Sequence, residues 1–532
     1  MNNRQNNSRK VRVRFAPSPT GALHMGGVRT ALFNYLFARR YGGTFILRIE
    51  DTDAGRLVPG AEQYIIEALQ WCGIVPDEGL TADWKIAETA DARHPHAPYR
   101  QSQRKPLYRQ YAEDLVRAGH AYYAFDTAET LDKCRREAEA AGQSFTYNYT
   151  IRRQMDTSLD MPLDAVQRRL LSDTHWVIRF KMPENRDVQM HDLIRGDITV
   201  NTATLDDKVL WKRADELPTY HLANIVDDRL MAISHVIRGE EWLPSLPLHY
   251  LLYEAFGWSA SQPDFAHLSL LLKPDGKGKL SKRDGERHGF PVFPLQWLSP
   301  AGDISRGYRE DGYFPEAFVN MLALLGWNPG TEQELFSLDE LAALFSLERV
   351  VKSGARFNPD KARWFNQQYL KSKSDADLAL LYRPLLQEKG IEVSMEKITA
   401  VCGLIKERAT FVADFWDLSS YFFVPPATFD AKAVQKYWRP ETPDLIRQLA
   451  DVLSAVEPFT KEATGEAVHA WLADRNLPPG AVMNALRLCL VGAAKGPGIF
   501  DIISLLGKTE VELRITNYEL RITNYESGIR NS

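Results

Sequence analysis

The sequence predicts an α/β protein built on a doubly wound parallel sheet, followed by a long all-helical region. Apolar residues alternate with arginines over 11–15, which is the period of a strand. Apolar residues then recur at helical spacing over 26–40, until Gly42-Gly43 ends the run. Residues 45–49 are almost wholly apolar, as in a parallel strand covered on both faces. Such a strand–helix–strand unit binds ligands at the carboxyl ends of its strands.

The bulk composition describes a large protein whose overall charge does not select its partners. At 532 residues the chain has room for about three or four domains. A net charge of −4 means that contact with a polyanion requires local basic patches. The four cysteines lie far apart and form no paired zinc or redox motif, which fits a reducing cytoplasm. We expect a cytoplasmic protein without a signal peptide or a membrane helix.

The order of later elements suggests an interrupted core. Residues 100–215 have the mixed pattern of an insertion, after which strands and a helix of the core resume. From Pro291 to about residue 515 the pattern is mostly helical. The expected elements include a helix at 104–118, strands at 176–180, 231–237 and 266–272, and helices at 246–256, 317–325 and 481–492.

The end of the chain contains a tandem copy. The heptapeptide ELRITNY occupies 512–518 and recurs at once at 519–525. Two copies are too few for a solenoid. We therefore predict a disordered tail over 513–532 with no inferable function.

The loop APSPTGALHMGG, at 16–27, combines bare backbone with one imidazole. Taken alone, a histidine next to glycines is most simply a turn with a surface side chain. Here Gly26 and Gly27 open a helix, whose unpaired N–H groups and positive dipole end favour anions. His24 could then donate to a phosphate oxygen and stabilise charge that develops during transfer at phosphorus.

A second loop, KPDGKGKLSKRDG at 273–285, carries five cations against two acids. A solvated charged loop is the simpler interpretation of such a run. However, the loop follows an apolar strand of the same core that carries His24. We therefore expect two phosphate-binding elements on one sheet.

These two loops carry a family resemblance. His24-Met25-Gly26-Gly27, together with Lys279-Leu280-Ser281-Lys282-Arg283, resembles the paired signatures of class I aminoacyl-tRNA synthetases, in particular the glutamyl-tRNA synthetase family. The resemblance covers nearly the whole chain up to about residue 515. Further matching segments are RFAPSPTG at 14–21, RTALFNYLFAR at 29–39, FILRIEDTD at 45–53, LPTYHLANIVDD at 217–228, VIRGEEWLPS at 236–245, REDGYFPEAFVNMLALLGW at 309–327 and FSLERVVKSGARFNPDKARWFN at 345–366.

The resemblance implies a Rossmann-like catalytic domain with an inserted α+β connective domain, followed by all-helical stem-contact and anticodon-binding domains. The bounds that it implies are 10–115 and 216–290 for the two catalytic halves, 116–215 for the insertion, 291–375 for the stem-contact domain and 376–512 for the anticodon-binding domain.

The chemistry that the resemblance implies is glutamate–tRNA ligation with ATP and Mg²⁺. Glutamate attacks the α-phosphate of ATP, and the glutamyl adenylate then passes its acyl group to the 3′ end of tRNA for glutamate. The implied catalytic residues are His24, Lys279 and Lys282. The implied ATP contacts are these three with Gly26, Gly27, Glu241 and Leu272.

Glutamate brings two carboxylates and an ammonium into a pocket. Arg14 and Arg238 end two strands, and a guanidinium can grip a carboxylate through two parallel hydrogen bonds. Glu50 is expected to hold the ammonium, although an Arg14–Glu50 salt bridge of purely structural role is the alternative. By family analogy Tyr220, Ala16 and Ser18 line the same pocket. A buried arginine facing the neutral amide of glutamine would lose several kcal/mol, which is enough for about thousandfold selectivity.

Some features depart from the family pattern. Gly27 replaces the last histidine of the general signature, which is usual in the glutamyl branch. The stretch Tyr122-Tyr123-Ala124-Phe125-Asp126 lacks the cysteines that hold zinc in some relatives, so we expect no structural zinc and no other metal site. Residues 286–306 are extra, and we favour a packing role for them over a tRNA contact.

Two other functions compete with this interpretation. A nucleotidyltransferase also uses a histidine–glycine loop on a doubly wound sheet, but it leaves the last two hundred residues unexplained. A tRNA-binding or regulatory relative without catalysis would not need His24, Glu50, Arg238 and Lys282. A monomer is expected. Whether tRNA for glutamine is also charged stays open at this stage.

Overall fold

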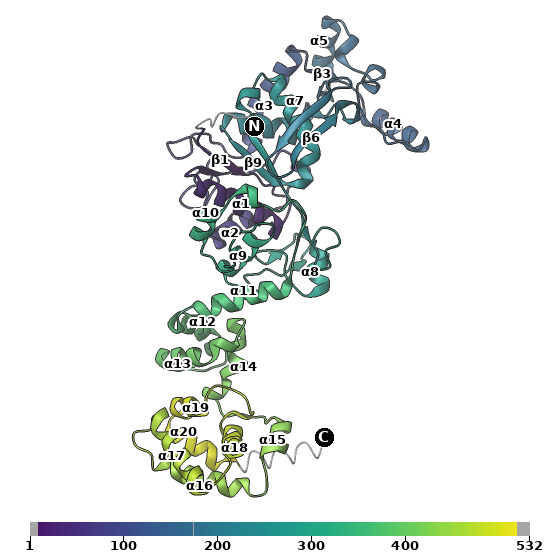
Figure 1. The fold of residues 1–532 in the computed structure, drawn as a ribbon. Coiled ribbons are helices and arrows are strands. Elements are labelled where there is room, and N and C mark those ends of the chain that lie inside the picture. The colour runs from purple at the N-terminus through teal and green to yellow at the C-terminus, as the bar shows by residue number, and fades with distance from the viewer. Residues whose placement is uncertain (1–8, 174, 519–532) are drawn as a thin grey trace. The chain divides into compact units, whose positions relative to one another are not determined.

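The computed structural model describes residues 9–173 and 175–518, and the chain divides into two compact units (Figure 1). The first unit is Met1–Ala362 and the second is Arg363–Ser532. Each unit has its own buried core. The candidate site lies in the first unit.

The first unit opens with the expected strand–helix–strand. The strand β1 (Arg12–Phe15) pairs in parallel with β2 (Thr44–Leu47), and α1 (Met25–Arg40) connects them. All four residues of β2 are buried, which confirms the prediction of a strand covered on both faces. The helix α1 packs on β1 and β2, so its first turn lies close to the carboxyl end of β1.

A four-stranded sheet in the order β6–β5–β10–β9 continues the core. The strands β9 (His235–Gly239), β10 (Asp264–Leu268) and β5 (Asp187–Asp192) are parallel neighbours, and β6 (Gly196–Asn201) pairs antiparallel with β5. The β5–β6 hairpin thus extends the core sheet, which the expectation of one inserted domain over 116–215 did not anticipate.

Most expected elements of this unit are present, but one strand is displaced. The strand expected at 231–237 begins only at His235, because α6 (Tyr220–Leu230) runs up to Met231 and Ala232 turns the chain with a positive φ of 52°. The other helices and short strands of the unit are α2 (Ala61–Trp71), α7 (Leu246–Ala255), α8 (Lys282–His288), α9 (Pro315–Leu324), α10 (Leu338–Leu344), β11 (Leu271–Leu272) and β14 (Ala355–Arg356).

The rest of the inserted region forms a separate antiparallel sheet. Its strand order is β3–β4–β7–β8, and α3 (Lys105–Arg117) packs against all four strands. The remaining bounds of this region are β3 (Ala121–Ala124), α4 (Ala128–Ala140), α5 (Leu163–Ser172), β4 (Val177–Phe180), β7 (Val209–Lys212) and β8 (Leu217–Pro218).

The segment after α8 does not follow the helical expectation. Residues 291–314 contain the antiparallel pair β12 (Trp297–Leu298) and β13 (Ile304–Ser305) instead of a helix. The prolines of FPVFPLQWLSP remove N–H donors and exclude a helix here. Val292, Phe293 and Leu295 are buried, so this segment packs into the first unit.

The second unit is all helical. Here α16 packs on α17, α18 and α20, and α17 packs on α19. The helix α11 (Pro359–Ser372) leads into this unit, whose other helices are α12 (Asp375–Glu388), α13 (Met395–Ile405), α14 (Phe415–Ser419), α15 (Ala431–Tyr437), α16 (Thr442–Ser454), α17 (Lys461–Asp474), α18 (Pro479–Val491), α19 (Ile499–Leu506) and α20 (Lys508–Thr516).

The prediction of disorder from residue 513 is wrong for residues 513–518. The first copy of the heptapeptide belongs to α20 and the turn after it, where Val511 and Ile515 are buried and the Tyr518 ring packs 4.8 Å from the Trp438 ring. These apolar positions recur at helical spacing, so the copy folds against its own unit. The second copy, 519–525, lies outside the described residues.

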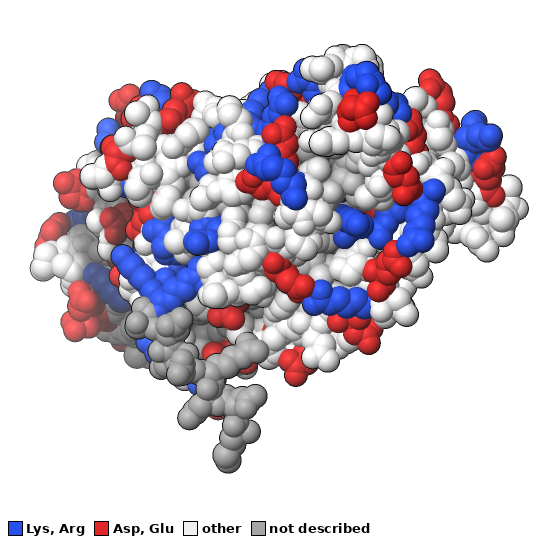
Figure 2. Space-filling model, turned by 90° about the horizontal axis from the view of Figure 1, so that it is seen from above, with Lys and Arg blue, Asp and Glu red and all other residues white. Residues whose placement is uncertain are grey.

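Charged side chains of both signs are interspersed on the face shown in Figure 2. This distribution agrees with the small net charge of −4. In the described part of the chain, no helix combines the length and the apolar character that a membrane crossing requires.

Candidate active site

A cavity of about 350 Å³ lies at the carboxyl ends of β1 and β9. Strand ends of a parallel sheet are where doubly wound folds bind ligands. Eight residues expected from the sequence line this cavity, namely Arg14, Ala16, Ser18, Gly27, Glu50, Tyr220, Arg238 and Glu241.

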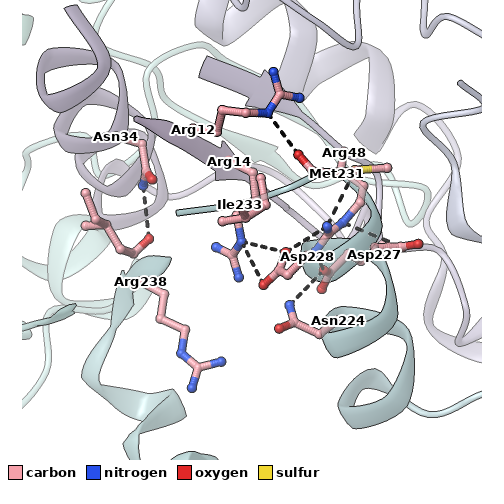
Figure 3. A network of polar contacts seen from close by, with 12 residues as sticks. Arg12, Arg14, Asn34, Arg48, Asn224, Asp227, Asp228, Met231, Ile233 and Arg238 are labelled. Atoms are coloured by element: carbon pink, nitrogen blue, oxygen red, sulfur yellow. Dashed lines mark hydrogen bonds and ion pairs between the residues drawn. The ribbon is translucent and has the colours of Figure 1, made fainter. Parts of the chain in front are cut away.

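The β1–β2 side of the cavity contains a chain of buried charges (Figure 3). Arg14 Nε donates to Asp228 Oδ1 over 3.0 Å. Arg48 links two carboxylates, donating through Nη1 to Asp228 Oδ1 over 2.8 Å and through Nη2 to Glu50 Oε1 over 2.9 Å. Asn224 also donates to Glu50 Oε1, over 3.3 Å. Arg48 Nε also lies 3.8 Å from Asp227 Oδ2, and Arg104 Nε donates to Asp227 Oδ1 over 2.9 Å. With that pair included, the formal charges of three arginines and three carboxylates cancel.

The pKa values in this chain follow from burial and pairing. Burial acts to raise the pKa of Asp228, but Arg14 and Arg48 together hold it below its usual value. Burial raises the pKa of Glu50, and Arg48 and Arg14 offset only part of that effect. Glu50 therefore has a pKa that a nearby ligand cation would lower.

The β9 side of the cavity presents Arg238 in a different setting. Arg238 is 4% exposed and Arg14 is 3% exposed, so the two guanidinium groups are equally buried. Among the described residues, the hydrogen-bond partners of Arg238 are all neutral, and Figure 3 shows it apart from the charged chain. The partners of the Arg238 guanidinium are His267 Nε2 at 3.0 Å, Tyr220 Oη at 2.8 Å, His249 Nδ1 at 3.3 Å and the Trp242 carbonyl at 3.4 Å.

Aromatic and acidic groups complete the wall on this side. The Trp242 ring stacks on Tyr220 with centroids 4.2 Å apart, which fixes the tyrosine hydroxyl beside Arg238. The Glu241 carboxylate lies against the backbone of Gly239, where a Cβ would collide with it. Glycine at this position therefore keeps Glu241 at the edge of the cavity.

The histidine loop is ordered by a helix cap. His24 Nδ1 accepts from the Gly26 N–H over 3.2 Å as the N-cap of α1, so the other ring nitrogen, Nε2, carries the proton. Burial, helped by the charge of Lys279, lowers the pKa of His24 to about 4. The ring packs edge-on against Phe293 at 5.9 Å. Its Nε2 is buried and has no partner among the described residues. The neutral imidazole is thus oriented as a donor.

The lysine loop is tied to β11, which pairs with β14 in a two-stranded sheet of its own and not, as the sequence led us to expect, in one sheet with the strand before His24. The Leu280 N–H donates to the Leu271 carbonyl over 2.8 Å, and Leu272 forms a bridge with Lys279. Lys282 starts α8 and lies 3.5 Å from Glu286. In the described part of the chain, His24, Gly26, Leu272, Lys279 and Lys282 do not line the cavity of Arg14 and Arg238.

Comparison with known proteins places this site in a family. Residues 10–364 match the catalytic domain of class I tRNA synthetases (E and Q), and residues 377–518 match an anticodon binding domain. A glutamate–tRNA ligase of Flavobacterium psychrophilum is 56% identical over 508 residues, 96% of this chain and 98% of that protein. The chain belongs to the glutamate–tRNA ligase family. A crystal structure from Elizabethkingia meningosepticum, a glutamate tRNA ligase in complex with its amino acid, is 52% identical with a TM-score of 0.90 and covers 96% of this chain and 99% of that one.

Several cavity residues of this glutamate–tRNA ligase family member were not singled out from the sequence. Asn224 and Trp242 lie within LPTYHLANIVDD and VIRGEEWLPS, two of the segments that carry the family resemblance. Their place in these segments was the sequence signal that could have identified them as cavity residues. Arg48 and Asp228 also lie in such segments, but only the structure shows that they neutralise Arg14 and Glu50. Within the described ranges, no group of three or more His, Cys, Asp or Glu side chains is arranged to hold a metal ion.

Proposed function

We propose that the protein activates L-glutamate with Mg²⁺-bound ATP and transfers the glutamyl group to tRNA for glutamate. A glutamate carboxylate oxygen attacks the α-phosphorus, and the bond to pyrophosphate breaks. A ribose hydroxyl of the tRNA end then attacks the acyl carbon, and AMP leaves. The observation that carries this proposal is a pocket with one neutral chain of buried charges and one buried arginine, Arg238, that has no carboxylate partner among the described residues; Arg56, which also lines the pocket, is exposed to solvent.

The charges of the pocket orient the amino acid. The Arg14–Arg48–Glu50–Asp228 chain has no net charge, so it suits the amino acid's own ammonium and α-carboxylate, which also cancel. Glu50 receives the ammonium, with Tyr220 and Asn224 nearby, while Ala16 and Ser18 supply backbone. Arg238 receives the carboxylate of the side chain as its counter-charge, and one Nη2 N–H that the four contacts do not use donates to it.

This arrangement discriminates against glutamine. The neutral amide of glutamine leaves the Arg238 cation buried and uncompensated. Such a mismatch costs about 3–5 kcal/mol, which corresponds to selectivity of thousandfold order.

The nucleotide binds beside the amino acid, across the two loops. The first N–H groups of α1, at Gly26 and Gly27, and the His24 Nε2 proton receive phosphate oxygens. Lys279 and Lys282 neutralise the charge that develops as pyrophosphate leaves. Glu241 contacts the ribose, and Leu272 contacts the adenosine. The charge of Lys279 helps to lower the pKa of His24, so the two loops lie near each other, as binding to one triphosphate requires.

The helical second unit binds the tRNA anticodon. Its match to an anticodon binding domain over 377–518 supports this assignment. The catalytic halves 10–115 and 216–290 and the stem-contact domain 291–375 stay part of the proposal. The inserted domain proposed over 116–215 excludes the β5–β6 hairpin, and the anticodon-binding domain proposed from 376 extends past 512 to residue 518. The protein acts in the cytoplasm as a monomer.

ATP–pyrophosphate exchange tests the proposal. We expect exchange that depends on glutamate when tRNA is present. Absence of exchange with both glutamate and tRNA would favour a non-catalytic tRNA-binding role, and exchange without any amino acid would favour a nucleotidyltransferase. Charging assays with purified tRNAs for glutamate and for glutamine then measure tRNA specificity.

A further inference from the structure

We propose that Asp192 and His267 form a buried pair that positions Arg238 for the side-chain carboxylate of the substrate. Neither residue lines the cavity itself among the described residues, so both act through Arg238. This inference rests on the proposed glutamate site.

The three residues form one line across neighbouring strands. His267 on β10 is the register partner of Arg238 on β9, and β5 ends at Asp192 on the other side of β10. Arg238 Nε donates to His267 Nε2 over 3.0 Å, and His267 Nδ1 lies 2.6 Å from Asp192 Oδ2. Both Asp192 and His267 are 0% exposed, so water does not compete for these contacts.

The chemistry of the donors fixes one imidazole tautomer. An arginine Nε–H can only donate, so His267 Nε2 must accept, and the single ring proton must reside on Nδ1. Asp192 Oδ2 is the acceptor that stabilises this tautomer. The other oxygen, Asp192 Oδ1, accepts from the backbone N–H groups of Ile194 at 3.0 Å, Arg195 at 2.8 Å and His267 at 3.3 Å. The carboxylate is thereby locked in orientation.

The imidazole also keeps a carboxylate away from the guanidinium. On the opposite side of the pocket, Asp228 contacts Arg14 directly and neutralises it. Asp192 instead reaches Arg238 through a neutral ring, which fixes the Nε edge of the guanidinium. The cation therefore remains available to a carboxylate from the ligand. A direct Asp–Arg pair at this place would compete with the substrate.

The variant Asp192→Asn should reverse the donor and acceptor roles between residue 192 and His267. Because three backbone N–H groups require an oxygen, the asparagine oxygen stays on them and its NH₂ group faces His267 Nδ1. His267 must then carry its proton on Nε2, where it opposes the Arg238 Nε–H. A carboxylate-to-amide change that selects the wrong histidine tautomer can abolish function without altering the fold.

Steady-state kinetics of the full-length protein with tRNA present test the inference. We expect Asp192→Asn to raise the KM for glutamate at least tenfold and to leave the KM for ATP within twofold. Asp77→Asn is the matched control, since Asp77 also accepts from a backbone N–H, at Phe45, and from Arg39, but lies outside the cavity. The control should leave both KM values within twofold. An unchanged KM for glutamate in Asp192→Asn, or an equal rise in both KM values, would overturn the inference.

A pair of variants at His267 decides the matter even if Asp192→Asn does not fold. His267→Gln retains an oxygen that accepts from Arg238 Nε, whereas His267→Leu has none. We expect the KM for glutamate to rise at least tenfold in His267→Leu and less than threefold in His267→Gln. Equal KM values in the two variants would contradict the positioning role.

Nitrogen-15 NMR of histidine-labelled protein reports the tautomer directly. The signal missing from His267→Gln identifies His267, and we expect it to show a proton on Nδ1. A proton on Nε2 in the unmodified protein would overturn the inference. Arg238→Gln separates this inference from the proposed glutamate site. If Arg238→Gln binds glutamate normally, the proposed site is wrong. If Arg238→Gln loses glutamate binding and Asp192→Asn does not, only the positioning role of Asp192 and His267 is wrong.

Discussion

The two sides of the pocket hold equally buried arginines in opposite electrostatic states. On the β1–β2 side, Arg14 contacts the Asp228 carboxylate at 3.0 Å and belongs to a chain without net charge. On the β9 side, the described partners of Arg238 are a hydroxyl, two imidazoles and a carbonyl. The first side is complete within the fold, and we propose that a ligand anion completes the second.

Because of this difference, we expect Arg14 to contribute mainly to the stability of the fold and Arg238 mainly to recognition of the substrate. A buried cation with a carboxylate partner contributes to folding, and its loss leaves the partner uncompensated. A buried cation with neutral partners gains most when an anionic ligand arrives. Substitutions on the two sides should therefore affect different measurements, and four variants or conditions test this expectation.

The largest effect is expected on the β9 side. Arg238→Gln should lower kcat/KM for glutamate about thousandfold, or about 4 kcal/mol, because the side-chain carboxylate loses its cation. Its free energy of unfolding should stay within about 1 kcal/mol of the unmodified protein, since no carboxylate in residues 9–173 and 175–518 contacts Arg238 directly. Exchange kinetics and urea denaturation measure the two quantities. A large loss of stability with normal kinetics would reverse the assignment of the two sides.

The corresponding change on the β1–β2 side should reduce stability. Arg14→Gln should lower the free energy of unfolding by about 3 kcal/mol, because Asp228 keeps only Arg48 as a cationic partner. The double variant Arg14→Gln/Asp228→Asn removes the carboxylate as well and should recover much of the stability, but not the activity. If the double variant is no more stable than the single one in urea denaturation, the charged chain does not stabilise the fold.

A smaller effect is expected at the histidine loop. His24→Asn should lower kcat about a hundredfold by removing one donor to the phosphates, about 2.7 kcal/mol. Asparagine is also a good N-cap, so α1 and the stability should be preserved. A thermal melt checks stability, and kcat with saturating ATP checks the donor. Unchanged kcat would exclude His24 from the chemical step.

The smallest expected effect is a loss of folding stability at acidic pH. The pKa of His24 lies near 4 in the folded protein and rises to its ordinary value, near 6.5, on unfolding. The unfolded chain therefore binds more protons between these values, and stability falls as the pH drops below 6.5. Between pH 7 and 5.5 the loss should be about 1 kcal/mol for this histidine. Urea denaturation of His24→Asn should show a correspondingly weaker dependence on pH. An equal dependence would mean that His24 is not buried as a neutral ring.

Local patterns predicted one side of the pocket better than the other. Arg14 lies near the end of β1 and Glu50 follows β2 by three residues, and the period and apolar character of both strands are visible within a few residues, so the sequence placed both residues at this edge of the sheet. The setting of Arg238 depends on Asp192, which is 46 positions away in a hairpin expected to belong to the insertion. The alternation of Val188 and Met190 with polar residues was a usable strand signal, but it does not identify the partner strand.

Two other differences have local physical causes. Prolines between Pro291 and Pro300 exclude the helix that apolar spacing favoured there. In the last helix, the tandem repeat suggested a disordered tail, whereas Ile515 and Tyr518 of the first copy are buried in the second unit.

Calorimetric titration of glutamate and glutamine into the unmodified protein and into Arg238→Gln tests the central claim most directly. We expect the unmodified protein to bind glutamate at least about a hundredfold more tightly than glutamine, and Arg238→Gln to bind the two with nearly equal affinity. If Arg238→Gln still prefers glutamate by the original factor, the unmatched arginine does not select the substrate.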